Sequence, residues 1–422
     1  MATGASPAAA RQQRRKNLKK LNNSPNLGRF AVVNHFNRTV DTLAPTTNFP
    51  RLEAFLPQNI WPWISNYLKF AFTPRFPFPG PAQSRTRCIY SLPPSTSAGS
   101  VRIAIAGDWG TGTQEAETII QLMVQTKPDL TIHLGDVYYV GDEPEIEENC
   151  FGKSRNGFAG IRWEQGERGS FALNGNHEMY ANGGPYFTVF LKSLGLKDSG
   201  EQQFASFFSL DVGAWRILAI DTGYNSVGIP ILSLIPGLNS IPAIGGDCHL
   251  EKELMEWLRN DVKPQQHPKP TLILSHHQYF SSFPDKAYTK PASQLAEFFP
   301  NQEVLWIWGH EHRLAIYDKF AKDGGITAYG RCLGHGGMPV EMANPNQHPE
   351  VPLLLYDPRS TPLNGTPTGI NGYVMATIAN DVLTLDYRDI TDTRLFVEEF
   401  RPGVGGSLTH QIVDRGSVLT AP

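Results

Sequence analysis

Short apolar runs alternate with amphipathic segments from residue 99 onward. The runs VRIAIAG and LTIHLGD are rich in branched apolar residues and have the length of buried strands. Between them, TQEAETIIQLMVQT carries apolar residues at helical spacing. This alternation of strand and helix predicts an α/β core. The predicted strands cover residues 101–107, 130–136, 170–176, 215–221, 271–277 and 303–310, and the predicted helices cover residues 113–126 and 250–262.

The pattern changes near the C-terminal end of the chain. Residues 372–390 alternate apolar and polar positions on both sides of Asn380-Asp381, which predicts a β-hairpin that turns at this pair. Three long stretches rich in Gly and Pro are predicted to be loops around one edge of the sheet, at residues 141–169, 223–248 and 333–371.

A polar residue with metal-binding or catalytic chemistry stands at the C-terminal end of each of five predicted strands. In α/β proteins this edge of the sheet is where ligands bind. One such residue would carry little information, but five in succession indicate a shared site. These residues are Asp108, Asp136, Asn176, His276 and His310.

The fragments around these residues are GDWG, GDVYY, GNHE, ILSH and GHEH. They resemble the blocks GDxG, GDxxY, GNH[DE], VxxH and GHxH of the calcineurin-like metallophosphoesterases and, within them, the purple acid phosphatases. One block differs, since Ile273 stands where that block has Val. The resemblance spans residues 99–395 and implies a four-layer α/β/β/α sandwich of two mixed sheets, to which this chain adds an N-terminal extension. The residues by themselves indicate only an α/β class.

The resemblance also implies a dinuclear metal centre. Two cations about 3.5–4 Å apart can clamp the oxygens of a phosphoryl group. Oxygen donors around the first ion favour Fe(III), and imidazoles around the second favour Zn, Mn or Fe(II). The implied ligands are Asp108, Tyr139 and His312 for the first ion, Asn176, His276 and His310 for the second, and Asp136 as the bridge.

Two ligand assignments have an alternative. Gly110 stands where many relatives carry a histidine ligand, so Tyr139 is expected to complete the first ion's set. Tyr138 is the alternative phenol, although neighbouring strand residues point to opposite faces and both are not expected to bind. His277 is the alternative to His276, because both follow the same predicted strand.

The catalytic expectations follow the same resemblance. His177 is expected to bind a phosphate oxygen or protonate the leaving group, with Glu178 orienting it. Asn176 and His335 are further residues expected at the substrate. The expected reaction is hydrolysis of phosphate monoesters of small molecules by a metal-bound hydroxide, as in acid phosphatases. The alternatives are a phosphodiesterase acting on nucleotides or lipid head groups, and a metal-retaining binding protein without catalysis.

Composition narrows the class of partners. The chain has 37 basic and 40 acidic residues and a formal net charge of -3, so no overall field attracts nucleic acid. The four cysteines form no C-x-x-C pair, which argues against a zinc finger, and we expect reduced thiols. No apolar run reaches 18 residues, so no transmembrane helix is expected.

The N-terminal part of the chain differs from the rest in amino-acid composition. Residues 1–28 read as a disordered basic arm, and residues 29–98 as an extension rich in aromatics and proline. The extension is expected to pack along a domain of residues 99–395, with a peripheral membrane or oligomer contact as the alternative. Residues 396–422 are expected to be a C-terminal tail. The basic run lacks the apolar segment of an export signal, so the expected location is cytoplasmic, with export left open.

Overall fold

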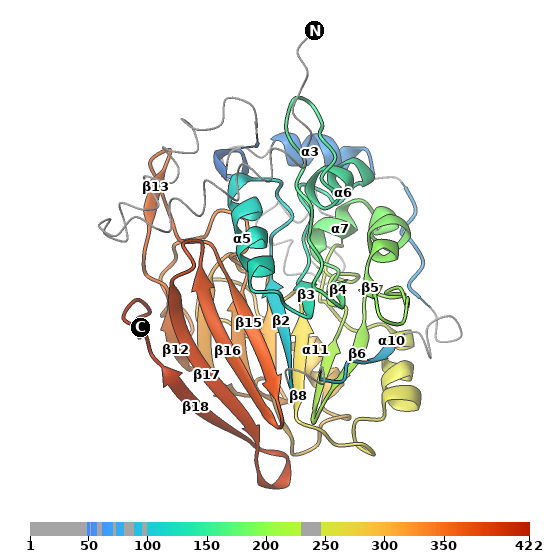
Figure 1. Ribbon diagram of the computed structural model, residues 1–422, viewed down its shortest axis with the longest axis vertical. Coiled ribbons are helices and arrows are strands. Elements are labelled where there is room, and N and C mark those ends of the chain that lie inside the picture. The colour runs from blue at the N-terminus through green and yellow to red at the C-terminus, as the bar shows by residue number, and fades with distance from the viewer. Residues whose placement is uncertain are drawn as a thin grey trace.

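The computed structural model describes residues 49–50, 52–56, 61–70, 73–79, 88–94, 99–228 and 246–422 (Figure 1). The basic arm predicted for residues 1–28 lies outside the described residues. Within the described part, two eight-stranded mixed sheets form the body of the molecule. The predicted α/β sandwich of two mixed sheets is therefore confirmed.

Sheet 1 contains the first three predicted strands and the predicted hairpin. Its order is β18-β17-β16-β15-β2-β3-β4-β5, with β2, β3 and β4 parallel and the remaining pairs antiparallel. The bounds are β2 Ser100–Ala106, β3 Leu130–His133, β4 Gly169–Ala172, β5 Gly195–Leu196, β15 Gly372–Ala379, β16 Val382–Asp389, β17 Arg394–Pro402 and β18 Leu408–Asp414.

Sheet 2 has the order β1-β6-β7-β8-β9-β11-β10-β12, and its central strands β7, β8, β9 and β11 run parallel. The bounds are β1 Ile89–Ser91, β6 Phe208–Val212, β7 Trp215–Ala219, β8 Thr271–Ser275, β9 Glu303–Trp308, β10 Leu314–Phe320, β11 Thr327–Leu333 and β12 Leu353–Tyr356. A separate small hairpin pairs β13 Thr361–Leu363 with β14 Thr366–Thr368.

Three apolar clusters show the order of the layers. The largest joins residues of both sheets, such as Ile103 and Phe171 of sheet 1 with Ile217 and Leu305 of sheet 2, so it lies between them. The outer face of sheet 1 packs against α5 Gln114–Gln125 and the π-helical turn η3 Tyr186–Phe190. The outer face of sheet 2 packs against α10 Lys252–Trp257, η6 Leu258–Val262 and α11 Thr289–Leu295. The layers are thus helix, sheet, sheet and helix.

Local sequence explains where the helices begin. The side chain of Thr113 accepts a hydrogen bond from the amide of Ala116 and caps α5. Asp142 and Glu145 form a reciprocal capping box at the start of α6 Glu143–Asn149, inside a stretch that was predicted to be loop. The remaining described helices are α7 Asn176–Tyr180, α3 Trp61–Leu68 and the short turns η1 Leu52–Phe55, η4 Leu191–Ser193 and η7 Val404–Gly406. None of the helices in the described ranges is long and apolar enough to cross a bilayer.

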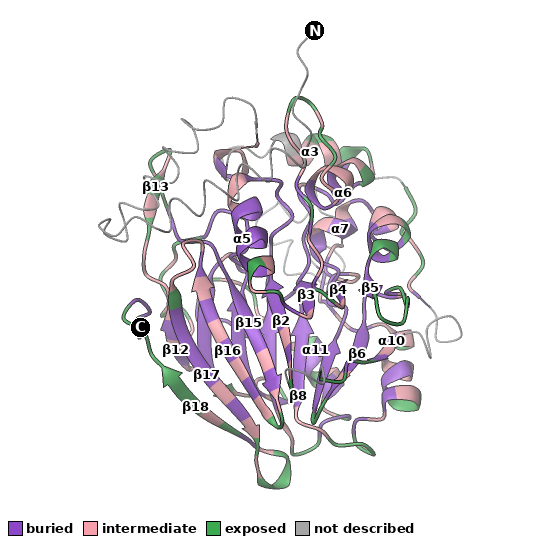
Figure 2. Cartoon of the chain, viewed as in Figure 1, coloured by how far each residue is buried: buried purple, intermediate pink, exposed green. Residues whose placement is uncertain are grey.

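The sheets extend past both predicted domain boundaries. Strand β1 lies before residue 99 and pairs in parallel with β6, so part of the predicted extension belongs to sheet 2. Strands β17 and β18 continue sheet 1 beyond residue 395, where a tail was predicted. Figure 2 shows β18 as a largely exposed edge strand. Such a strand has too few buried positions to show apolar alternation, which is why its sequence resembles a tail.

A buried ion pair joins the two sheets. Arg331 on β11 and Glu398 on β17 make two contacts, Nε to Oε1 at 2.6 Å and Nη2 to Oε2 at 2.7 Å, and both side chains have no exposed surface. Tyr387 and His410 contact the same carboxylate. The pair therefore links sheet 2 to the two C-terminal strands of sheet 1.

Replacing Arg331 by Met is expected to lower the free energy of unfolding by about 3–5 kcal/mol at pH 7, because the Glu398 carboxylate is then buried without its guanidinium partner. Urea denaturation measures this loss. The control is Arg259→Met, which removes a solvent-exposed pair with Glu297 and should cost only about 0–1 kcal/mol. Equal losses for the two variants would contradict the assignment.

The same pair predicts a dependence of stability on pH. Burial acts to raise the pKa of Glu398, but Arg331 and His410 outweigh it and lower that pKa to about 2. Because an unfolded glutamate has a pKa of about 4.3, the pair stabilises the fold above that pH, and the contribution is lost as the pH falls toward 2. This part of the acid sensitivity should be absent in Arg331→Met.

Candidate metal centre

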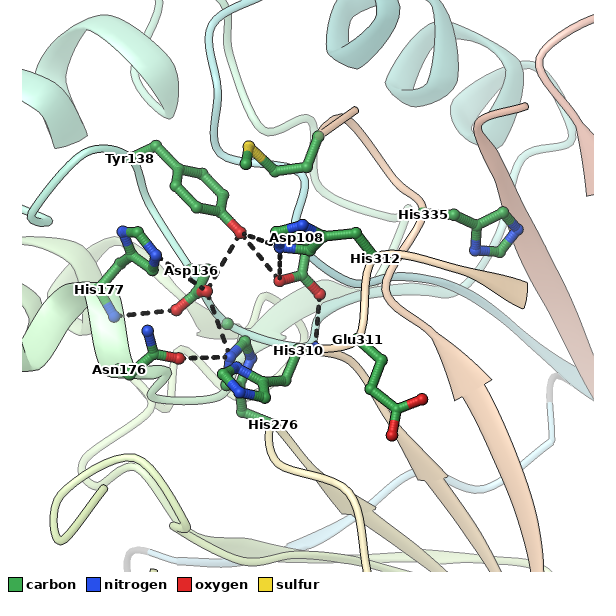
Figure 3. Close-up of polar contacts among 12 residues, drawn as sticks. Asp108, Asp136, Tyr138, Asn176, His177, His276, His310, Glu311, His312 and His335 are labelled. Carbon is green, nitrogen blue, oxygen red and sulfur yellow. Dashed lines mark hydrogen bonds and ion pairs between the residues drawn. The ribbon is translucent and has the colours of Figure 1, made fainter. Parts of the chain in front are cut away.

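The site lies where strands of both sheets end. Sheet 1 contributes Asp108 after β2, Asp136 after β3 and Asn176 after β4. Sheet 2 contributes the three histidines that follow β8 and β9. Figure 3 shows these side chains pointing toward one another. Six of the seven predicted ligand residues therefore lie together: Asp108, Asp136, Asn176, His276, His310 and His312.

The two carboxylates form the buried centre of this group. Asp108 has no exposed surface and Asp136 is 1% exposed. The Asp108 Oδ2 accepts a hydrogen bond from the His310 amide at 2.8 Å, and the Asp136 Oδ1 accepts one from the His177 amide at 3.0 Å. The His276 Nε2 lies 3.3 Å from the Asp136 Oδ2. Ligand atoms of Asp108, Asp136 and His276 all lie within 4.8 Å of one another.

A second group of potential ligand atoms adjoins the first. It consists of His276, His277 and His310, whose ligand atoms also lie within 4.8 Å of one another. His276 belongs to both groups. Its Nε2 contacts Asp136 and lies 3.2 Å from the Asn176 Oδ1, whereas the His277 Nδ1 lies 3.2 Å from the Thr222 hydroxyl. Both rings adjoin His310, and of the two histidines His276 is the one that also contacts Asp136 and Asn176.

The electrostatics of the site are those of anions surrounded by imidazoles. Burial acts to raise the pKa of Asp136, but His276 and His177 hold it well below its usual range. Burial acts to lower the pKa of His276, but Asp136 raises it to about 9. The pKa of His312 rises against burial to about 10 because Asp108 and Glu341 flank its ring. Burial lowers the pKa of His310, and the like charge of His276 lowers it further, to about 3.

These residues fit metal ions. Within the described residues, the ion-pair partners of Asp108 and Asp136 are histidines, which are themselves good ligands when neutral. Two buried carboxylates need a compensating positive charge. Carboxylate oxygens and imidazole nitrogens are the donors that divalent and trivalent transition metals take in proteins.

The backbone at the site is held in an unusual conformation. Asp108, Asp136 and His310 have φ angles of 55°, 73° and 64°, in the left-handed region that residues other than glycine rarely adopt. Strain of this kind concentrates at functional sites, where the surrounding structure enforces it. Glycines permit the close approach. A Cβ added to Gly175 would lie 2.1 Å from the Asp136 Oδ1, and one added to Gly309 would lie 2.6 Å from the Asp108 Oδ2.

The tyrosine at the site is Tyr138, and the prediction of Tyr139 does not agree with the observed contacts. The Tyr138 hydroxyl lies 2.9 Å from the Asp108 Oδ1, 3.1 Å from the Asp136 Oδ2 and 3.2 Å from the His312 Nε2 (Figure 3). These are the three other residues expected around the first ion. Tyr138 is the alternative phenol that the sequence left open.

Tyr139 is turned toward the N-terminal extension. Its ring stacks on Phe55 with centroids 4.7 Å apart, and its hydroxyl donates to the Ala54 carbonyl at 3.2 Å. A motif confined to residues 135–139 contains no information about this partner. The assumption that only one of the two neighbouring phenols points inward is consistent with the structure, but the choice between them depended on the extension.

His177 has the position expected of it, whereas Glu178 does not orient its ring. The His177 Nε2 lies 3.8 Å from the Asp136 Oδ2, and its Nδ1 lies 2.5 Å from the Tyr139 carbonyl. The Glu178 carboxylate instead accepts hydrogen bonds from three backbone amides, those of Asp136, Val137 and Gly175. Glu178 therefore joins the loop of Asp136 to the loop of Asn176. The sequence missed this role because backbone amides leave no trace in a motif.

His335 does not face the site, contrary to the prediction. It is 2% exposed, and in Figure 3 its ring lies apart from the cluster and points away from it. The Nε2 would lie only 2.7 Å from a Cβ added to Gly372, so the ring packs against the start of β15. The following Gly336 amide donates to the Gly107 carbonyl, which ties this loop to the end of β2.

Two further residues reach the site without having been predicted. The Glu341 Oε1 lies 3.4 Å from the His312 Nδ1, and the Asn176 Nδ2 donates to the Tyr180 hydroxyl at 3.2 Å. Tyr180 stands four residues after Asn176, a spacing that places both on one face of α7. This spacing could have indicated from the sequence that Tyr180 lies near Asn176. Glu341 lies in a long loop that offered none.

The family is decided by a comparison of the sequence with models of known families. The model of the calcineurin-like phosphoesterases matches residues 101–314, just over half of the chain. The chain belongs to this family. The match begins at β2 and ends at the first residue of β10, so it includes all six clustered residues that were predicted as ligands. No curated protein sequence matches the chain.

Solved structures of similar fold share little sequence with this phosphoesterase. A purple acid phosphatase from yellow lupin (Lupinus luteus) seeds is 16% identical over 69% of this chain and 52% of its own, with a TM-score of 0.43. PhoD is 13% identical over 76% and 72% of the two chains, with a TM-score of 0.43. GAP50 of Plasmodium, an anchor in the inner membrane complex, is 13% identical over 75% and 91%, with a TM-score of 0.42. This chain thus spans about half the length of the lupin phosphatase, and likenesses this distant establish neither activity nor substrate.

The close packing at Gly175 gives a test of the centre. Gly175→Ala should weaken metal binding, because the new methyl group would occupy the position of the Asp136 Oδ1. Metal content per chain, measured on protein dialysed against limiting zinc or iron, should fall. Gly184→Ala is the matched control, since a Cβ there meets no atom within 4 Å. Full metal content in Gly175→Ala would show that Asp136 is not a ligand.

Proposed function

We propose that this calcineurin-like phosphoesterase hydrolyses phosphate monoesters of small molecules at a dinuclear metal centre. The observation that carries the proposal is the convergence of two buried carboxylates with three histidines, Asn176 and the Tyr138 hydroxyl. Beside this group lies a further histidine, His177, which is not needed as a ligand. A protein that only retained metal would have no use for that last residue, His177. Its side chain is 17% exposed and is therefore within reach of a bound molecule.

The contacts support a division of the ligands between two ions. Tyr138 touches Asp108, Asp136 and His312, and these four residues would hold the first ion. Asn176, His276 and His310 would hold the second, with Asp136 shared, because the His276 ring contacts both Asn176 and Asp136. A phenol with two carboxylates favours Fe(III), and an amide with two imidazoles favours Zn, Mn or Fe(II).

When bound, the two ions supply an activated water and neutralise the charge of the phosphoryl group. The chain's own residues supply the proton for the leaving oxygen. The Tyr139 carbonyl accepts a hydrogen bond from the His177 Nδ1, so the Nε2 is the nitrogen left to face the substrate. In the imidazolium form this nitrogen donates to the departing alkoxide. The Asp136 amide and the Gly175 amide are fixed by Glu178, which keeps the ligand loops in place.

Turnover of two chromogenic substrates tests the reaction class. The metal-loaded protein is expected to hydrolyse p-nitrophenyl phosphate with a higher kcat/KM than bis-p-nitrophenyl phosphate. The reverse order would establish a phosphodiesterase instead. No turnover of either substrate by protein with two metals bound would leave only a binding function.

A pair of variants tests the tyrosine at the first ion. Iron-loaded protein should absorb visible light, because a phenolate bound to ferric iron has a charge-transfer band. Tyr138→Phe should abolish this band, while Tyr139→Phe should keep it, since the Tyr139 hydroxyl donates to the Ala54 carbonyl. The opposite result would restore Tyr139 as the ligand. A colourless iron-loaded wild type would exclude a ferric phenolate.

The dependence on leaving group tests His177. With an alkyl phosphate, His177→Ala should lower kcat by about 10²–10⁴-fold, the usual contribution of a positioned general acid. With p-nitrophenyl phosphate the loss should be far smaller, because p-nitrophenolate departs without a proton. Metal content, measured on the same samples, should not change. Equal losses on both substrates would contradict a role as the acid.

A further inference from the structure

The N-terminal extension contacts the surroundings of the candidate metal centre at Tyr138 and Tyr139 and, on the side of the second ion, at Tyr180. The Tyr180 hydroxyl accepts a hydrogen bond from the Asn176 Nδ2 at 3.2 Å. The oxygen and the nitrogen of a side-chain amide are bonded to the same carbon and point in different directions. A hydrogen bond that fixes the Asn176 Nδ2 therefore also fixes the direction of its Oδ1. The Asn176 Oδ1 accordingly faces the cluster, 3.2 Å from the His276 Nε2. A reversed amide would present hydrogens to a cation and could not bind it.

The same tyrosine contacts the candidate acid. The rings of Tyr180 and His177 meet edge to face, with centroids 5.0 Å apart and planes at 74°. Aromatic pairs of this geometry add stabilisation beyond the area that they bury. The Tyr180 side chain therefore contacts both a candidate ligand, Asn176, and the candidate proton donor, His177.

Helix α3 of the extension holds Tyr180. Trp63 and Tyr67 each meet its ring edge to face, with centroids at 5.3 Å and 6.1 Å, and the two stack on each other at 5.7 Å. Figure 1 shows α3 beside α6 and α7, at the end of the molecule where β2 terminates. The Asn66 Nδ2 donates to the Glu145 Oε1 at 3.0 Å and attaches α3 to α6.

The chain that follows α3 is attached to the end of α7. The Asn182 Nδ2 donates to the carbonyls of Phe70 and Thr73, and the Phe76 amide donates to the Asn182 carbonyl at 2.8 Å. Asn182 stands two residues after Tyr180 and has a φ angle of 58°. The extension is thus bound to α7 at two successive points, one at Tyr180 and one at Asn182.

We propose that Tyr180, held by Trp63 and Tyr67 of the extension, is a positioning residue of the metal centre that orients the Asn176 carbonyl toward the second ion. The proposal rests on the dinuclear centre proposed above. Under it, the segment before the family domain is part of the working site. The phosphoesterase domain alone would bind its second metal less tightly.

The test uses the full chain, with metal removed, and measures the affinity for Zn²⁺ by calorimetric titration. Tyr180→Phe removes the hydroxyl and keeps the ring, and is expected to weaken the second binding event by about 10–100-fold, as loss of a group that orients a ligand does. The first event should not change. Trp63→Ala should weaken the second event in the same direction, because it frees the Tyr180 ring.

The control is Phe78→Ala. Phe78 belongs to the same extension and stacks on Phe207 at 5.6 Å, but its ring contacts are with Phe207 and Tyr224. It should lower the unfolding temperature and leave Zn²⁺ affinity unchanged. If Trp63 acts through Tyr180, the double variant Trp63→Ala, Tyr180→Phe should bind Zn²⁺ about as weakly as Tyr180→Phe alone.

The results separate the positioning role of Tyr180 from the existence of the dinuclear centre. Wild-type affinity in Tyr180→Phe would overturn the positioning role, as would equal weakening by Phe78→Ala and Trp63→Ala, which would indicate general loosening. A wild type that binds two Zn²⁺ keeps the dinuclear centre whatever these variants do. A wild type that binds no metal would remove the proposed function itself, and the two failures are therefore distinguishable.

Discussion

The burial of two carboxylates at one edge of the sandwich is the constraint on which the rest of the structure depends. Asp108 and Asp136 are almost completely removed from water, and charge in such a place is costly unless it is compensated. The groups around the two carboxylates provide this compensation. Three histidines approach from the other sheet, the Tyr138 hydroxyl joins both carboxylates, and backbone amides occupy the remaining oxygens. Both aspartates also have a left-handed backbone.

The distance between the two halves of the site is set by how the sheets pack. Sheet 1 carries the carboxylates and Asn176, while sheet 2 carries the histidines, so any sliding of one sheet would separate the candidate ligands. The apolar layer between the sheets resists such sliding, and the Arg331–Glu398 pair gives it a defined register. Strands β17 and β18, which lie outside the family match, thus contribute to the geometry of a site that they do not touch.

The extension explains why Tyr138, and not Tyr139, lies against the carboxylates. Phe55 and Ala54 hold Tyr139 away from the carboxylates, and Trp63 and Tyr67 hold Tyr180 against the residues of α7. Both effects originate before the matched domain, and both act on residues next to candidate ligands. In this phosphoesterase the site is therefore a product of the family sandwich together with a segment that the family pattern does not include.

The sequence by itself determined the α/β class, the order of the central strands along the chain, the hairpin at Asn380 and six residues that lie together at the site, because these depend on periodicity and on positions next to strand ends. It did not determine which tyrosine faces the carboxylates, the backbone role of Glu178, the position of His335 away from the cluster or the pairing of β1, β17 and β18. Those features depend on contacts between segments far apart in the chain. Only the tertiary structure decides them, because a side chain turns toward whichever distant partner the packing of the two sheets and the extension brings within reach.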